Sequence, residues 1–177
     1  MKLIYLIIFI INVFLSKIVL AQIIAVVNIN SLIDNNNYYK EIIKDMEINQ
    51  QKYLEKFELK EKVLSDKLKD LEQSKLILNE IEINAQIDNY NEELAAFTIN
   101  VEEFNLHYQN QVINIREIIL KEIFLLLEKY AIENEVDLIL DSASYLIASN
   151  SIDITDNIEN KLQNINLELE YTSFENN

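Results

Sequence analysis

The 177-residue sequence contains no glycine, no proline and no cysteine. Without glycine there is no Gly-rich phosphate-binding loop, and without proline no helix has a proline kink, so Asn, Asp and Ser must make the turns. The absence of cysteine excludes disulfides, thiolate metal ligands and a cysteine nucleophile. Half of the residues are hydrophobic and a quarter are charged. This composition is typical of a folded domain and not of a disordered acidic chain.

Positive charge and histidine are also scarce, with 15 Lys and Arg against 30 Asp and Glu. Nucleic-acid binding needs a basic surface and is therefore not expected, and neither is docking on anionic lipid head groups. The single histidine, His107, excludes a His-rich metal site and is predicted to be a partly exposed structural residue. Adjacent carboxylates such as Glu92 and Glu93, or Glu102 and Glu103, point in different directions on a helix. We therefore expect neither an enzyme nor a cofactor.

Residues 1–21 have the features of a cleavable secretory signal peptide. Lys2 gives a positive start, an uncharged stretch follows from Leu3 to Leu15, and a small residue precedes the predicted cleavage point at Gln22. An uncleaved anchor in the inner membrane is the alternative, but the uncharged stretch before Lys17 is shorter than the ~20 apolar residues that span a bilayer. Cleavage would leave 13 basic and 30 acidic residues, a net charge of −17.

The segment 38–111 carries apolar residues at alternating spacings of three and four, which is the pattern of a coiled coil. The positions are Leu54, Phe57, Glu61, Leu64, Leu68, Leu71, Lys75 and Leu78 in the first half, and Ile87, Tyr90, Leu94, Phe97, Val101, Phe104, Tyr108 and Gln111 in the second. Two such seams predict an antiparallel helical hairpin with its tip near the midpoint, residues 79–84. A single unbroken helix from residue 38 to about residue 132 is the alternative.

The two ends of the chain predict a small strand-containing body, made of residues 22–37 and 112–166. The first part opens with Ile23–Ile29, a short β-branched apolar run that suits a buried strand, followed by a short helix. The second part contains the end of the long helix, predicted strands at Val136–Asp141 and Tyr145–Ser149, and a final helix. The predicted fold class is therefore α+β and mostly α.

Burial of this body requires more than one copy of the chain. The stretch from Val112 to Leu127 is apolar on too many sides for one seam, and three short strands bury little by themselves. Strands pooled from several copies would complete the core. We therefore predict an oligomer whose body includes Ile24, Val26, Ile118, Phe124, Leu138 and Leu140. After Asn166 the chain is polar, and a frayed tail is predicted for residues 167–177.

Three terminal segments, Ile24–Leu32, Val136–Asp141 and Ser151–Asp156, flank the predicted hairpin. They resemble the first strand, the closing strands and the final helix of the Skp/OmpH family of periplasmic chaperones. The order of signal peptide, strand, hairpin, strands and helix is also that of the family, so the resemblance covers essentially the whole mature chain. It implies a homotrimer with a small β-barrel body and three helical hairpins, or tentacles, around a cavity.

The resemblance also implies a function. Members of this family capture unfolded outer-membrane proteins without ATP, so the expected partners are such clients and further copies of this chain, with no cofactor. Well-studied members are basic, with Lys and Arg on their tentacles proposed to meet lipopolysaccharide. Here Leu76–Ile115 contains seven acidic residues and no Lys or Arg, so no lipopolysaccharide site is carried over. The alternative is a structural or adaptor coiled coil of the cell envelope without general chaperone activity.

Overall fold

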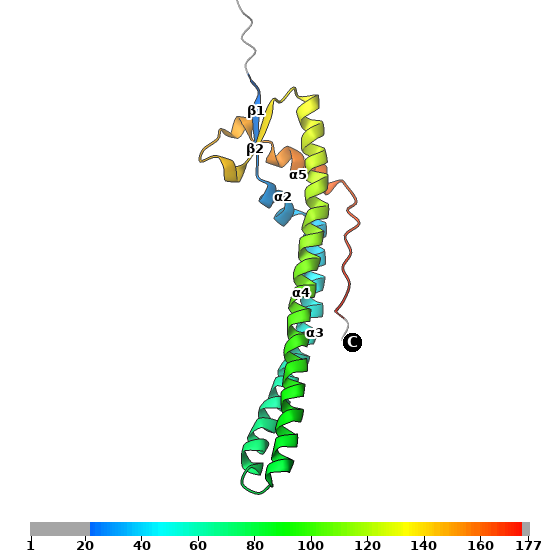
Figure 1. Cartoon of the computed structure of the whole chain (residues 1–177). Coiled ribbons are helices and arrows are strands. Elements are labelled where there is room, and N and C mark those ends of the chain that lie inside the picture. Colours follow the sequence, from blue (N-terminus) through cyan, green and yellow to red (C-terminus); the bar gives the residue numbers. More distant parts are fainter. Residues whose placement is uncertain (1–21, 175–177) are drawn as a thin grey trace, which may run out of the picture.

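The computed structural model describes residues 22–174 and shows a long helical hairpin that extends from a small body (Figure 1). The predicted fold class is confirmed, because the molecule is mostly helical, contains one small sheet and pairs its two long helices as a hairpin. Residues 1–21, the predicted signal peptide, lie outside the described residues.

Two helices form the hairpin: α3 from Asn37 to Ser74 and α4 from Glu80 to Glu133. They lie side by side and antiparallel, and α4 continues beyond the start of α3 into the body (Figure 1). At 1.5 Å per residue, the 38 residues of α3 give the arm a length of about 57 Å. The alternative of one unbroken helix is wrong, because the chain reverses direction between Ser74 and Glu80.

The tip of the hairpin comprises residues 75–79 and so comes earlier in the chain than the predicted 79–84. The reason is local, because Asn79 caps α4 and starts the helix at once. Its side-chain oxygen accepts hydrogen bonds from the backbone N–H groups of Ile81 and Glu82, while the Glu82 carboxylate accepts one from the backbone N–H of Asn79. This capping box is visible in the sequence as Asn79 followed three residues later by Glu82. The prediction placed the tip at the midpoint of the two seams and did not take this capping box into account.

The predicted seam of the first arm consists of two rows of residues spaced by seven. The structure confirms that one row faces α4. In place of the other row, the residues one position earlier in the chain face α4. On the side that meets α4, the buried and half-buried residues include Tyr53, Phe57, Leu64, Lys67 and Leu71 of α3 and Leu78 of the tip, whereas Leu54, Glu61 and Leu68 of α3 and Lys75 of the tip are exposed. In α4 the predicted seam positions are buried or half-buried except Leu94, which is exposed next to a half-buried Glu93. The displacement places Lys67 beside Glu93, so a charged pair takes a position that leucine was expected to occupy.

The sheet of the body has two parallel strands, β1 (Ile24–Val27) and β2 (Leu138–Asp141), with Ile24 opposite Leu138. Two short helices, α2 (Ile29–Asn35) and α5 (Thr155–Gln163), pack against each other and against α4 beside this sheet. Each strand therefore comes from a different end of the chain, as the sequence predicts. The pairing of β1 with β2 brings those two ends together.

The predicted strand at Tyr145–Ser149 is wrong. Between β2 and α5 the chain forms two short 3-10 helices, η1 (Ser142–Ser144) and η2 (Asn150–Ile152), and the intervening segment is irregular. A strand needs a neighbour with free backbone groups. The outer edge of β1 is not available to it, because β1 pairs with β2 on one side and its Val26 forms a bridge to Asp153.

The core lies where the base of the hairpin meets the body. It contains buried side chains from α2, α4 and α5: Leu32, Ile33, Ile115, Ile119, Ile123, Ile158 and Leu162. Asn36 is buried at the turn between α2 and α3 and caps α3 by accepting a hydrogen bond from the backbone N–H of Tyr39. Arg116 of α4 reaches the same corner, where its guanidinium donates to the Tyr39 hydroxyl and the Asp34 carboxylate. The hairpin and the body therefore share one core.

The prediction of a frayed tail is wrong for its described part, which ends at Phe174. After α5 the chain runs in an extended conformation back along the hairpin (Figure 1). Leu167 and Phe174 are buried, and Leu169 and Tyr171 are half-buried. Apolar residues at alternate positions 167, 169 and 171 suit an extended segment with one face against the helices. We call residues 165–174 the tail segment.

Candidate functional site: apolar surfaces on the body and the hairpin

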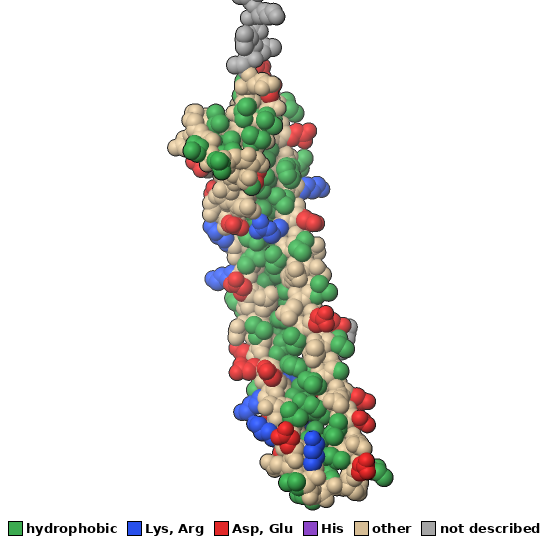
Figure 2. All heavy atoms as spheres, turned by 60° about the vertical axis from the view of Figure 1, so that its left-hand side comes forward, with side chains coloured by type: hydrophobic (Ala, Val, Ile, Leu, Met, Phe, Trp, Pro, Cys, Tyr) green, Lys and Arg blue, Asp and Glu red, His purple; other side chains and the backbone are tan. Residues whose placement is uncertain are grey.

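Exposed apolar side chains gather on the body around its small sheet. Leu138 is 47% exposed, and its partner across the sheet, Ile24, is 39% exposed. Leu146 and Ile147 follow in the irregular segment and are 101% and 91% exposed. Figure 2 shows hydrophobic side chains at the surface of this body, above the hairpin. A surface of this kind on a small protomer is typical of a contact with another protein chain.

The six residues predicted for an oligomer body are not equivalent. Ile24, Ile118, Phe124 and Leu138 are exposed, Leu140 is half-buried and Val26 is buried within the protomer. Val26 therefore supports the protomer's own sheet and offers no surface to a neighbouring copy. The four exposed side chains lie on β1, β2 and the base of α4, where a neighbouring chain could cover them.

A second apolar surface lies on α4 near the body. Leu120, Phe124 and Leu125 line a shallow groove together with the charged residues Glu117, Lys121 and Glu128. Phe124 and Leu125 are more than half exposed. The sequence predicts burial of this stretch on several sides, and in the protomer only the row Ile115, Ile119 and Ile123 is fully buried. The exposed members of the stretch, Ile113, Ile118, Phe124 and Leu125, remain open to a partner.

A row of apolar side chains also follows the hairpin on α4. Ile99, Leu106 and Ile113 are spaced by seven residues, so they lie on the same face of the helix, and they are 55%, 55% and 44% exposed. We call these three residues the outer row. Figure 2 shows hydrophobic side chains along much of the length of the hairpin, with acidic and basic side chains toward its edges and its tip. Sequence reasoning missed this row, although a seven-residue repeat outside the main seam could have revealed it.

A polar cluster interrupts the apolar contact between the arms. Glu93 of α4 lies 2.5 Å from the Lys67 ammonium and 3.2 Å from the Lys60 ammonium, both on α3. Hydrogen bonds from Lys67 and then from Lys60 hold the pKa of the Glu93 carboxyl below its ordinary value. A helix rotated by one residue would separate these charges, so the cluster favours the observed pairing of the two arms, although exposed ion pairs contribute little individually.

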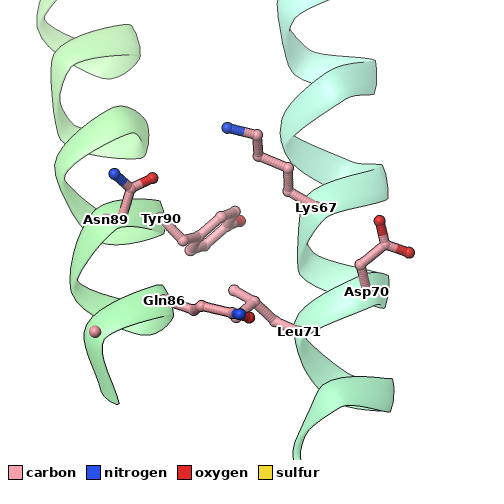
Figure 3. Close-up of a pocket in the computed structure, with 7 residues that line it drawn as sticks. Lys67, Asp70, Leu71, Gln86, Asn89 and Tyr90 are labelled. Atoms are coloured by element: carbon pink, nitrogen blue, oxygen red, sulfur yellow. The ribbon is translucent and has the colours of Figure 1, made fainter. Parts of the chain in front are cut away.

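Toward the tip the arms enclose a crevice of about 440 Å³ lined by residues of both helices (Figure 3). Tyr90 and Gln86 of α4 point toward α3, where Lys67 and Leu71 point back at them (Figure 3). The mixed polar and apolar lining lacks a convergent set of charges or nucleophiles. This crevice is a loosely packed stretch of the hairpin and not a site built for one small molecule.

The described residues also show whether a metal centre is present and what the single histidine does. Within residues 22–174, no group of three His, Cys, Asp or Glu residues is placed to hold a metal ion. The predicted structural residue His107 is half-buried on α4 and donates a hydrogen bond to the carbonyl oxygen of Thr172 at 2.8 Å. Of the helices in the described part, none has the length and apolar character needed to cross a bilayer.

An antiparallel helical hairpin on a small parallel-sheet body, with apolar side chains exposed on both, defines a class of proteins that carry a helical hairpin on a small body. A model of the OmpH family, described as outer membrane protein (OmpH-like), matches residues 23–162. The chain belongs to the OmpH-like family, and the predicted family membership is confirmed. The match ends within α5, so the tail segment lies outside it.

One solved structure shows the same fold. The crystal structure of a candidate outer membrane chaperone (OmpH-like) from Caulobacter crescentus CB15 aligns with a TM-score of 0.61 and 13% sequence identity. The alignment covers 81% of this chain and 85% of that chain. No curated protein matches the chain by sequence.

Proposed function

We propose that this protein is an ATP-independent holdase of the periplasm, which binds unfolded outer-membrane proteins and prevents their aggregation. Membership of the OmpH-like family supports a chaperone role, and the similar Caulobacter protein is a candidate outer membrane chaperone. The signal-peptide features of residues 1–21 support export. Sequencing of the mature N-terminus should find Gln22, whereas an intact N-terminus would indicate a membrane-anchored form.

The observation that carries this proposal is the outer row of Ile99, Leu106 and Ile113 on α4. Full burial of one such side chain contributes roughly 1.5–3 kcal/mol. Partial burial against an unfolded client contributes less, so affinity comes from several weak contacts. Such contacts exchange readily, which suits a chaperone that holds and releases clients without ATP.

The charge around the outer row supports the same role. The stretch Leu76–Ile115 has seven acidic residues and no Lys or Arg. Negative charge of this density repels neighbouring hairpins and so keeps the exposed outer rows from associating with one another. It also favours clients whose apolar segments are flanked by basic residues.

We further propose that the exposed body surface is buried in a homotrimer. Ile24, Leu138 and Phe124 would then contribute to a shared core, and the three hairpins would flank one space for the client. Multi-angle light scattering of the processed chain should give three times the protomer mass. A monomer at micromolar concentration would contradict this part of the proposal.

The test of holdase activity is the aggregation of an unfolded outer-membrane β-barrel protein diluted from urea. The processed chain should suppress light scattering near one oligomer per client, without ATP. Replacement of Ile99, Leu106 and Ile113 by Ser should weaken suppression at least severalfold. The matched control replaces three exposed polar residues of the same helix by Ala: Glu103, Gln109 and Asn110.

Circular dichroism should show that both triple variants keep the helical hairpin. If the unaltered chain does not suppress aggregation, the protein is not a general holdase, and the structural or adaptor alternative is favoured. If the control variant loses as much suppression as the apolar variant, the outer row is not the client-binding surface.

A further inference from the structure

The tail segment is held along the groove between α3 and α4 by its side chains. Leu167 and Phe174 are 6% and 7% exposed, although both follow the last helix of the body. Between them, the hydroxyl of Tyr171 donates a hydrogen bond to the backbone carbonyl of Asp45 on α3 at 3.1 Å. The segment therefore occupies a defined position on the hairpin.

The end of the tail segment sits in an aromatic cluster formed by both arms. The Phe174 ring lies 5.6 Å from that of Tyr53 on α3, 5.5 Å from that of Phe104 and 5.7 Å from that of His107 on α4, measured between centroids. These contacts have the tilted or edge-to-face geometry that aromatic rings prefer. The cluster therefore surrounds one aromatic side chain of the tail segment, that of Phe174.

The helices also hold the backbone of the tail segment with polar side chains. Gln111 accepts a hydrogen bond from the backbone N–H of Thr172 at 3.4 Å, and His107 donates one to the Thr172 carbonyl oxygen at 2.8 Å. The backbone N–H of Phe174 donates to the Tyr108 hydroxyl at 3.4 Å, and the Tyr53 hydroxyl donates to the Phe174 carbonyl. Backbone groups are the same in every polypeptide, so these contacts do not depend on the sequence of the tail.

The fit of the tail segment to the groove is incomplete. A crevice of about 380 Å³ remains between α3 and the tail, lined by Tyr38 and Ile42 on one side and by Leu167 and Leu169 on the other. The two glutamates between the apolar residues, Glu168 and Glu170, are exposed. The groove thus accepts an extended chain with apolar residues at alternate positions without being shaped closely to this one.

We propose that this groove binds extended segments of client polypeptide that carry apolar residues at alternate positions, and that the tail segment is its internal competitor. The inference rests on the proposed holdase function and adds a second binding surface to the outer row. A tethered segment has an effective concentration of about millimolar. The free client must therefore displace the tail, which lowers its apparent affinity by the fraction of chains whose groove is open.

The test uses the full processed chain and a variant, Phe174→Ala, in which the tail remains but loses its aromatic anchor. The probe is a fluorescently labelled peptide with the sequence of residues 165–177, followed by anisotropy. The unaltered chain should bind the peptide weakly, and the Phe174→Ala chain should bind it at least about tenfold more tightly. The control variant replaces the exposed Glu168 and Glu170 by Gln and should bind the peptide like the unaltered chain.

A competition experiment tests whether the groove binds client polypeptide. An unfolded outer-membrane β-barrel protein should displace the labelled peptide from the Phe174→Ala chain, and the same peptide carrying Ala at position 174 should bind more weakly. A chain that ends at Asn164 should behave like the Phe174→Ala variant if it keeps its helical circular dichroism.

If the peptide binds but client does not displace it, the tail is a structural strap and the inference is overturned. Equal peptide binding by the unaltered and Phe174→Ala chains would overturn it as well. Neither result would contradict the proposed holdase function, because suppression of aggregation by the unaltered chain is measured separately. If that suppression is absent while the peptide still exchanges, the proposed function fails and the groove remains only an intramolecular contact.

Discussion

Phe104 in the middle of α4 and Phe174 near the C-terminus pack edge to face, with ring centroids 5.5 Å apart and ring planes at 87°. Phe104 also packs edge to face on Phe57 of α3, at 5.1 Å. One buried side chain therefore joins both arms of the hairpin to the tail segment.

Replacement of Phe104 by Ala should lower the free energy of unfolding by about 3–5 kcal/mol, the usual cost of deleting a buried aromatic side chain. The expected loss is large because Phe104 is 3% exposed and contacts three rings, two on α3 and one in the tail segment. Urea denaturation followed by far-UV circular dichroism measures it. Leu106→Ala, on the same helix but 55% exposed, should cost less than about 1 kcal/mol. Equal losses would show that Phe104 is not a packing centre.

The ion pairs of Glu93 predict a dependence of stability on pH. The pKa of Glu93 is lowered mainly by hydrogen bonds from Lys67 and Lys60, so its carboxyl binds a proton more readily in the unfolded chain. Its contribution to stability is therefore present above the ordinary pKa of 4.5 and is lost as the pH falls through the lower pKa of the folded state. Glu93→Gln should reduce the fall in urea midpoint on acidification.

The control for this prediction is Glu92→Gln, one residue away and exposed. It should leave the pH dependence close to that of the unaltered chain. Added salt should shrink the difference between the Glu93→Gln variant and the unaltered chain, because these side chains are partly exposed and salt screens them. If Glu92→Gln alters the pH dependence of stability as much as Glu93→Gln does, the ion pairs of Glu93 are not its cause.

The capping box at the tip predicts the effect of a mutation at Asn79. Asn79→Ala removes the oxygen that accepts from the N–H groups of Ile81 and Glu82, and it should lower the free energy of unfolding by about 1 kcal/mol. Asn79→Ser keeps a capping oxygen and should recover most of that loss. If Ala and Ser have the same effect in urea denaturation, the cap does not stabilise the tip.

The exposed strand pair of the body predicts a mutation that should dissociate the proposed trimer. Ile24 and Leu138 lie opposite each other in the sheet and are both exposed in the protomer. Their joint replacement by Asp would place two charges in an apolar interface, which is costly. Sedimentation velocity should then show protomers. Leu76→Asp, at the exposed hairpin tip, is the control and should leave the mass unchanged.

The long helices were predictable from the sequence because helical hydrogen bonds are local. The repeat at Phe57, Leu64 and Leu71 marks the face of α3 that meets α4, and no glycine or proline interrupts it. The tip was predictable in principle, from Asn79 and Glu82. The second row of the seam was not, because the inward position of Lys67 depends on Glu93 in the opposite arm.

The helical hairpin, the family and the strands β1 and β2 could be predicted from the amino-acid sequence, because these depend on periodicity, β-branched runs and their order along the chain. The folded structure was needed to show that Tyr145–Ser149 does not form a strand and that residues 165–174 lie on the hairpin. The physical reason is the same in both cases. An extended segment has no internal hydrogen bonds, so its conformation depends on whether a distant part of the chain offers backbone partners or a groove. Asp153 forms a β-bridge to Val26 of β1, and the ring of Phe174 packs against the rings of Tyr53 and Phe104.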